Sequence, residues 1–278
     1  MNALDWDDIL ARSASTGAAP DLIFREEVQK AVLACLSLQE FFSQAVLQGG
    51  TALRLFYGNP RFSEDLDFVR KEPGQPATLT AHTAQIGPFL ERQFSFIDKA
   101  EAVIQKQTAT LERISVRLRG TDPSANLRLN LELAAVPSRS NAPKILRYPP
   151  INPAVRVESP SEILADKVTA LLFRPYLKGR DVWDLHYLLE EHKLTIDWIM
   201  VAQKAEDYGH QTADLDMRMG SASRRLAAEG PSALAQEMPR FLTPATLQQY
   251  AAVFPAMAAA TARRITKSQQ GRERGLGL

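Results

Sequence analysis

Two aspartates separated by one residue, Asp65 and Asp67, are the side chains of this sequence best suited to metal-dependent chemistry. They lie in the run Asp-Leu-Asp-Phe-Val, where polar and apolar residues alternate as on a β-strand with one buried face. On such a strand both carboxylates point the same way, about 7 Å apart. Carboxylates spaced like this suit one or two hard cations such as Mg²⁺, and two metals could stabilise both the attacking and the leaving oxygen of a phosphoryl group.

A glycine-rich turn, Gly49-Gly50-Thr51, precedes this pair. The apolar residues before the turn are typical of the end of a buried strand, and residues 51–56 are predicted to form one or two helical turns. Backbone N–H groups at such a helix start are a natural seat for phosphate. Taken alone, a Gly-Gly pair is usually just a turn and an Asp-x-Asp run is usually a solvated strand end. Their order in one short stretch is more informative.

The order Gly-Thr, a spacer over residues 52–64 and then Asp-Leu-Asp-Phe resembles the signature of the polymerase-β-type nucleotidyltransferase superfamily. Across residues 48–69, the strings GGTALRLFYG and RFSEDLDF resemble one branch, the AbiEii/MenT toxins of bacterial toxin–antitoxin and phage-abortive systems. The resemblance implies that Asp65 and Asp67 hold Mg²⁺. It also implies that the phosphates of a nucleoside triphosphate are bound by Gly49, Gly50, Thr51, Arg61 and Ser63.

A third acidic candidate lies on a second predicted strand, where leucines alternate with Arg128, Asn130 and Glu132. In the superfamily that this chain resembles, a third carboxylate on a neighbouring strand completes the metal site and helps to deprotonate the attacking hydroxyl. Glu132 is the candidate for that metal-binding and catalytic role. Asn130 lies on the same predicted face and could occupy the position instead, and Glu132 could also be an ordinary solvent-facing residue.

The resemblance returns near residues 162–188, in the string EILADKVTALLFRPYLKGRDVWDLHYLL. There the family pattern has a lysine helix, a basic loop and an Arg-Asp-x-x-Asp helix. It implies that Lys167 neutralises charge on the nucleotide phosphates, a task for which a compact ammonium is suited, and that Asp181 is a further catalytic residue. The simpler alternatives are a solvated Lys167, a helix-capping Asp181 and a local ion pair between Arg180 and Asp184.

The predicted fold class is α/β (α+β), with a nucleotidyltransferase-like mixed sheet domain over residues 1–150 and a helical domain over residues 151–278 that completes the active-site cleft. Apolar residues at alternating spacings of four and three predict a helix over residues 21–45, with Asp21 as its cap. Further predictions are a helix over residues 78–93 and strands over residues 94–104, 111–119 and 127–136. The proline-rich stretch 137–160 is predicted to be an extended linker. Helices follow, with starts predicted at Ser159-Pro160 and at Thr243-Pro244, where a capping side chain precedes a proline. Breaks are expected near Gly220 and at Gly230-Pro231, and the last ten residues are expected to be disordered.

Composition limits the function classes. The 278 residues carry a net charge of +1, so affinity for nucleic acid would have to come from local patches. Cys35 is the only cysteine, which excludes disulfides within the chain and cysteine-rich metal sites. No apolar run approaches membrane-spanning length, and the N-terminus is acidic where a signal peptide would be basic, so we expect a cytoplasmic protein.

The function that the resemblance implies is a toxin that transfers a nucleotide from a nucleoside triphosphate to the 3′ end of tRNA, and so blocks translation. A cognate antitoxin would restrain it. Basic positions that could face an RNA backbone include Arg218, Arg224, Arg225, Arg263, Arg264 and Lys267. Two alternatives stay open. One is a nucleotidyltransferase that acts on a small-molecule or protein hydroxyl, and the other is a nucleotide-binding regulator without catalysis.

Overall fold

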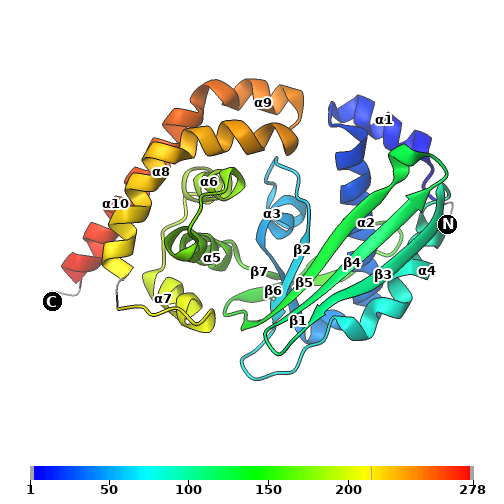
Figure 1. Ribbon diagram of the computed structural model, residues 1–278, viewed down its shortest axis with the longest axis horizontal. Coiled ribbons are helices and arrows are strands. Elements are labelled where there is room, and N and C mark those ends of the chain that lie inside the picture. The colour runs from blue at the N-terminus through cyan, green and yellow to red at the C-terminus, as the bar shows by residue number, and fades with distance from the viewer. Residues whose placement is uncertain (1–2, 214, 276–278) are drawn as a thin grey trace. The chain divides into compact units, whose positions relative to one another are not determined.

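A computed structural model describes residues 3–213 and 215–275, and the chain divides into two compact units between Glu158 and Ser159 (Figure 1). The first unit contains all the strands of the described chain, and the second is helical. The predicted domain boundary, after residue 150, lies before this division. The assignment of a catalytic domain and a helical domain on either side of residue 150 stays a prediction. Among the described residues, no helix combines the length and the apolar character needed to cross a membrane.

A seven-stranded mixed sheet forms the centre of the first unit, in the order β3-β4-β5-β2-β1-β7-β6 (Figure 1). Its strands β2 and β5 are parallel, as are β1 and β7, and the other neighbouring pairs are antiparallel. The predicted fold class is therefore confirmed. The strands are β1 (Ala45–Gln48), β2 (Leu66–Arg70), β3 (Ile97–Gln107), β4 (Leu111–Gly120), β5 (Leu127–Pro137), β6 (Asn141–Ile145) and β7 (Ala154–Glu158).

Helices accompany the sheet in the first unit. They are α1 (Trp6–Thr16), α2 (Pro20–Leu38), α3 (Gly49–Tyr57) and α4 (Thr83–Gln93), with 3-10 turns η1 (Phe41–Ser43), η2 (Thr80–His82) and η3 (Pro123–Ala125). Helix α2 buries the predicted apolar face, including Phe24, Val28 and Cys35. Burial raises the pKa of the Cys35 thiol to about 11, as expected for a cysteine that serves packing.

Helix α2 differs from its prediction at both ends. It ends at Leu38 because Glu40 adopts a left-handed backbone (φ 59°), after which the chain makes η1 and enters β1. Asp21 was wrongly predicted as the cap, since the N-cap is Ala19 and Pro20 occupies the first helical position. Proline favours that position because its missing N–H would have no partner there.

The proline-rich stretch 137–160 is not a linker, because it forms β6 and β7. Pro143 lies in β6, the last strand of the sheet, where an edge position tolerates a residue without an N–H donor. In β7, Val155 and Val157 are fully buried. The core of the sheet therefore extends through a segment whose composition alone indicated an exposed connection.

The second unit consists of helices, and two of the predicted starts are confirmed. Ser159 accepts a hydrogen bond from the Glu162 backbone at the start of α5, and Thr243 caps α9 in the same way. The elements are α5 (Pro160–Phe173), α6 (Gly179–His186), the π-helical turn η4 (Tyr187–Glu191), α7 (Trp198–Asp207), α8 (Leu215–Glu237), η5 (Met238–Arg240), α9 (Pro244–Tyr250), η6 (Ala251–Val253) and α10 (Phe254–Gly275).

The breaks predicted near Gly220 and at Gly230-Pro231 are wrong, because α8 runs through both places. A Cβ atom at Gly230 would lie 2.8 Å from the Ala258 Cβ of α10. The glycine therefore permits close approach of two helices, and this packing outweighs its low helix propensity. Helix α10 also continues to Gly275 through most of the tail that was expected to be disordered, and residues 276–278 lie outside the described part of the chain.

Candidate active site

Strand register brings two of the predicted acidic residues together in the first unit. Asp67 on β2 lies directly opposite Glu132 on the parallel strand β5. Leu66 and Phe68, which flank Asp67 on β2, are fully buried. Because side chains alternate along a strand, the carboxylates of Asp67 and Glu132 share the other face of the sheet. The apolar core thus fixes which face of the sheet carries the acids.

Asp65 comes one residue before β2 and is held by Asn130 of β5, whose Nδ2 donates to the Asp65 Oδ1 at 3.2 Å. With the amide in this orientation, the Asn130 Oδ1 is buried and has no hydrogen-bond partner among the described residues. A buried carbonyl oxygen without a donor is unfavourable unless a ligand supplies one. Both candidates for the third position are therefore at the site: Glu132 beside Asp67, and Asn130 beside Asp65.

Glu132 has a protein partner in Arg113 of β4, whose Nε lies 2.8 Å from the Glu132 Oε1. The side chains of this pair are 43% and 30% exposed, so water screens their attraction. Pairs of this kind contribute about 0–1 kcal/mol to stability. Arg113 can therefore be displaced from Glu132 at small energetic cost.

The glycine turn adjoins the acids. Gly49 has φ +73°, a backbone conformation that side chains with a Cβ rarely adopt, and an added Cβ would lie 3.5 Å from the Asp67 Oδ2. At Gly50 an added Cβ would collide with the Arg61 guanidinium. The two glycines thus allow the turn to pass close to a carboxylate on one side and to a guanidinium on the other.

Helix α3 begins at this turn, and its N-cap residue Gln48 makes no side-chain hydrogen bond to the first turn. The Thr51 side chain, 1% exposed, is used elsewhere: its hydroxyl donates to the Asp65 carbonyl oxygen at 2.5 Å. Thr51 therefore ties the start of α3 to the residue that enters β2. Its backbone N–H, at the positive end of the helix, is the group oriented for an anion.

Arg61 and Ser63 differ in exposure. Arg61 is 2% exposed, and its Nη1 donates to the Phe62 carbonyl oxygen at 3.0 Å. Ser63 is half-buried, and its carbonyl oxygen accepts a hydrogen bond from the Gln29 Nε2 of α2 at 3.0 Å. The burial of Arg61 against Gly50 favours a role in holding the turn over one in meeting a ligand directly.

The second unit brings Lys167 and Asp181 together. The Lys167 Nζ lies 2.7 Å from the Asp181 Oδ1 and 2.8 Å from the Asp184 Oδ2, and the Arg174 Nη1 lies 2.5 Å from the Asp181 Oδ2. Asp184 is fully buried, and the side chains of Lys167 and Asp181 are 14% and 11% exposed. Lys167 is therefore a buried ion-pair residue, which rules out the solvated alternative, and the N-cap of α6 is Lys178, not Asp181.

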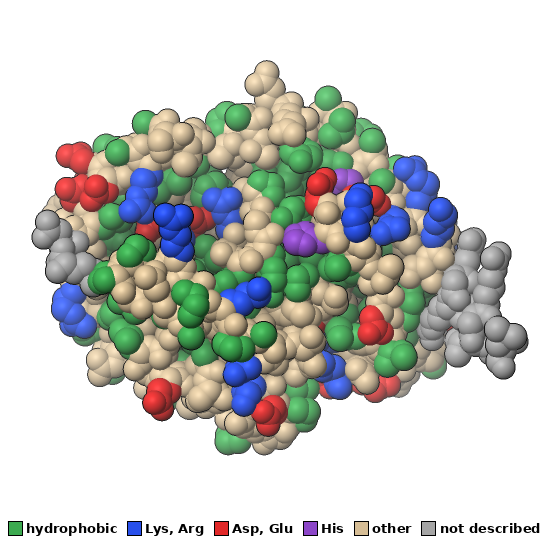
Figure 2. Space-filling model, turned by 180° about the vertical axis from the view of Figure 1, so that it is seen from behind, with side chains coloured by type: hydrophobic (Ala, Val, Ile, Leu, Met, Phe, Trp, Pro, Cys, Tyr) green, Lys and Arg blue, Asp and Glu red, His purple; other side chains and the backbone are tan. Residues whose placement is uncertain are grey.

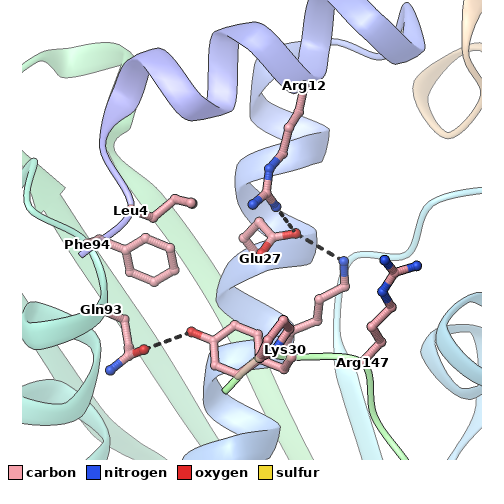
Figure 3. A pocket seen from close by; sticks show the side chains of 9 residues that line it. Leu4, Arg12, Glu27, Lys30, Gln93, Phe94 and Arg147 are labelled. Atoms are coloured by element: carbon pink, nitrogen blue, oxygen red, sulfur yellow. Dashed lines mark hydrogen bonds and ion pairs between the residues drawn. The ribbon is translucent and has the colours of Figure 1, made fainter. Parts of the chain in front are cut away.

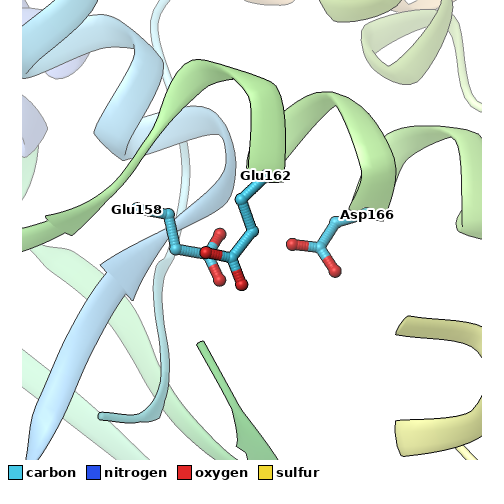
Figure 4. Close-up of side chains that lie close together, drawn as sticks. All are labelled: Glu158, Glu162 and Asp166. Carbon is cyan, nitrogen blue, oxygen red and sulfur yellow. The ribbon is translucent and has the colours of Figure 1, made fainter. Parts of the chain in front are cut away.

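Two further acids, Glu162 and Asp166, lie close together on α5 and were not predicted from the sequence as a cluster (Figure 4). Glu162 and Asp166 are one helical turn apart, and Lys204 of α7 lies 2.5 Å from the Glu162 Oε1 and 3.2 Å from the Asp166 Oδ2. Lys204 and the Glu162 side chain are fully buried. A lysine of the protein thus already provides the positive charge that these two acids require. Two acids four residues apart in a mostly apolar helix were the available sequence signal.

Comparison with known proteins places this arrangement in a family. The model of the family described as nucleotidyl transferase AbiEii toxin, type IV toxin–antitoxin system, matches residues 31–261. The protein JHP933 from Helicobacter pylori is similar in structure, with a TM-score of 0.59, 21% identity and coverage of 93% of this chain and 97% of that chain. A second H. pylori protein, described as a nucleotidyltransferase, has a TM-score of 0.54, 21% identity and coverage of 87% and 95%. No protein of curated function shows significant similarity to this chain.

Proposed function

The chain belongs to the AbiEii family of nucleotidyltransferase toxins of type IV toxin–antitoxin systems, and from this premise we propose that it transfers a nucleotide from a nucleoside triphosphate to the 3′ end of tRNA. The observation that carries the catalytic part is the register of Asp67 with Glu132, beside the turn at Gly49. Carboxylates and free helix-start N–H groups at one place are the two features that phosphoryl transfer requires.

Mg²⁺ fits the residues of this site. Asp65, Asp67 and Glu132 supply carboxylate oxygens, and the Asn130 Oδ1 adds a buried carbonyl oxygen without a donor. Hard divalent cations prefer such an all-oxygen set. When bound, the metal would neutralise charge on the phosphates and on the attacking oxygen.

The remaining roles follow from the contacts. Glu132, once released from Arg113, accepts the proton of the acceptor hydroxyl as its oxygen attacks the α-phosphorus and pyrophosphate leaves. The turn at Gly49, Gly50 and Thr51 binds phosphate through backbone N–H groups. Arg61 holds that turn, and Ser63 lies on the same connection. On the family resemblance, Lys167 and Asp181 belong to the catalytic machinery as well.

An RNA acceptor is supported by basic residues of the second unit. Arg224, Arg263 and Lys267 are exposed and line a cavity of about 710 Å³ along α8 and α10. Arg264 also lines this cavity and donates to the Leu189 carbonyl oxygen, whereas Arg225 donates to the Leu171 carbonyl oxygen. Figure 2 shows Lys and Arg side chains in several separate places on one face of the molecule, so any RNA contact depends on local patches. The cognate antitoxin remains the expected protein partner.

The test is incubation of the purified protein with Mg²⁺, total tRNA and each radiolabelled nucleoside triphosphate in turn. An Asp65→Ala, Asp67→Ala double variant serves as the control. We expect label in tRNA with the wild-type protein alone, and the triphosphate that gives it identifies the nucleotide. Label in a small molecule or a protein would favour the alternative acceptor. Triphosphate binding without pyrophosphate release would favour the regulator.

A further inference from the structure

A second cavity lies in the first unit, about 470 Å³ in volume and lined by residues of α1, of α2 and of the segments at residues 93–94 and 147–149 (Figure 3). None of its lining residues is one of the proposed catalytic, metal-binding or phosphate-binding residues. Its size is within the range of small-molecule sites, about 300–1,000 Å³. The cavity is thus large enough for a ligand of its own.

Positive charge exceeds negative charge on its wall. Arg12, Lys30 and Arg147 line the cavity together with one carboxylate, Glu27. Figure 3 shows Arg12 reaching from α1 and Lys30 from α2 to the same Glu27 oxygen, at 2.8 Å and 3.0 Å. Glu27 is thus shared between two cations, and Lys30 also lies 2.9 Å from the Glu26 Oε1, a carboxylate that it shares with Arg54. Positive charge still exceeds negative charge around the cavity, because Arg147 adds a cation that no carboxylate of the described residues pairs with.

Arg147 has a different setting. Its side chain is exposed and makes no ion pair or hydrogen bond with any residue that the structure describes. A guanidinium presents several N–H donors in a planar fork that matches phosphate oxygens. Arg147 is therefore the cation of this cavity whose binding capacity the described part of the protein does not use.

The rest of the wall is apolar or neutral. Leu4 and Pro149 supply accessible apolar surface, Phe94 lies buried behind them, and the Tyr148 hydroxyl donates to the Gln93 Oε1 at 3.1 Å. Burial raises the pKa of Tyr148 well above its usual range, so the phenol keeps its proton. The wall thus offers apolar contacts and a neutral hydroxyl next to the cationic group.

From this combination, we propose that the cavity binds a phosphate monoester with a flat, partly apolar body, of the class of a nucleoside 5′-monophosphate. The phosphate dianion lies against Arg147, Lys30 and Arg12, and balances the excess charge. The body lies along Leu4 and Pro149. The binding is non-covalent and separate from the proposed catalytic site.

Calorimetry on the full chain tests the proposal. The protein carries Asp65→Asn and Asp67→Asn, and the buffer contains EDTA, so that metal-dependent binding at the proposed catalytic site is removed. The ligands are AMP, GMP, inorganic phosphate and adenosine. We expect one site that binds a monophosphate, inorganic phosphate at least tenfold more weakly, and no measurable binding of adenosine.

Arg147→Gln then locates the site, with Arg119→Gln as the matched control, since Arg119 is exposed on β4 and outside the cavity. We expect Arg147→Gln to weaken monophosphate binding at least tenfold and Arg119→Gln to leave it unchanged. The ligand should also protect Lys30, but not the exposed Lys99, from acetylation measured by mass spectrometry. Absence of monophosphate binding, equal binding by Arg147→Gln, or adenosine binding as tight as AMP would each overturn the proposal.

Discussion

The sheet acids of the first unit and the ion pairs of the second unit show two ways of holding carboxylates. Asp67 and Glu132 are brought together by strand register, at a half-exposed position next to the glycine turn at the start of α3. Asp184 is fully buried and lies 2.8 Å from the Lys167 ammonium. The first arrangement can accept a cation from outside, whereas the second already contains one. Loss of a sheet acid should therefore affect activity, and loss of Asp184 should affect stability.

The largest expected effect is that of Asp67→Asn on catalysis. Removing one charge from the metal site should lower the rate of pyrophosphate release by about 10³-fold or more. Because the side chain is on the half-exposed face, the thermal midpoint should shift little. The control is Asp98→Asn, an exposed position on β3, which should leave the rate unchanged. A rate within tenfold of wild type for Asp67→Asn would contradict the assignment.

Asp184→Asn should lower the stability of the second unit, which Asp67→Asn should leave nearly unchanged. It removes one of the carboxylates that neutralise the buried Lys167, and breaking such a pair costs about 3–5 kcal/mol. Urea denaturation should show a lower free energy of unfolding, by about 3 kcal/mol because Asp181 still pairs with Lys167. Glu229→Gln, an exposed change on α8, is the control and should unfold as wild type. Wild-type stability for Asp184→Asn would show that this pair does not hold the second unit together.

A smaller effect separates the two candidates for the third position. Glu132→Gln should lower kcat by about 10²-fold, as expected for loss of a proton acceptor, and should remove the acidic limb of the pH–rate profile. Asn130→Ala should lower kcat less and keep that limb. The reverse order would assign the role to Asn130. Arg113→Gln, which removes the partner of Glu132, should leave kcat close to wild type.

The smallest expected effect concerns an ion pair that the first unit does bury. Burial alone would raise the pKa of Glu26, but the charges of Lys30 and Arg54 lower it below its ordinary value of 4.5. The stabilisation is therefore present above about pH 4.5 and is lost as the pH falls through the lower, folded-state pKa. Thermal midpoints should be lower for Glu26→Gln than for wild type at pH 7, and the difference should shrink towards pH 3. A constant difference would contradict the linkage.

The sequence predicted the parts of this fold that depend on local pattern. The alternation of leucines with Asn130 and Glu132 gave both the strand and its buried face, and the proline and serine at residues 159–160 gave the start of α5. Predictions from local pattern were wrong where contacts between distant segments determine the structure. Pro143 marks an edge strand rather than a linker because β7 pairs with β1, and Gly230 stays helical because α10 packs against it.

The candidate site shows the same limit. Spacing indicated Asp65 and Asp67, and the family resemblance made Glu132 the candidate for the third position. Neither predicted that Asn130 would contact Asp65 or that Arg61 would be buried against Gly50. Those contacts depend on how β2, β5 and α3 meet, which no short stretch of sequence specifies. The partners of Lys167 on α6 were unpredictable for the same reason.

Mn²⁺ binding followed by electron paramagnetic resonance, with a non-hydrolysable triphosphate present, tests the central claim most directly. The comparison is between Asp67→Asn on the sheet and Asp166→Asn on α5, both checked for folding by circular dichroism. We predict that Asp67→Asn loses the bound Mn²⁺ signal and that Asp166→Asn retains it, because Lys204 already neutralises the α5 acids. Retention by Asp67→Asn together with loss by Asp166→Asn would place the metal on α5 and contradict the account.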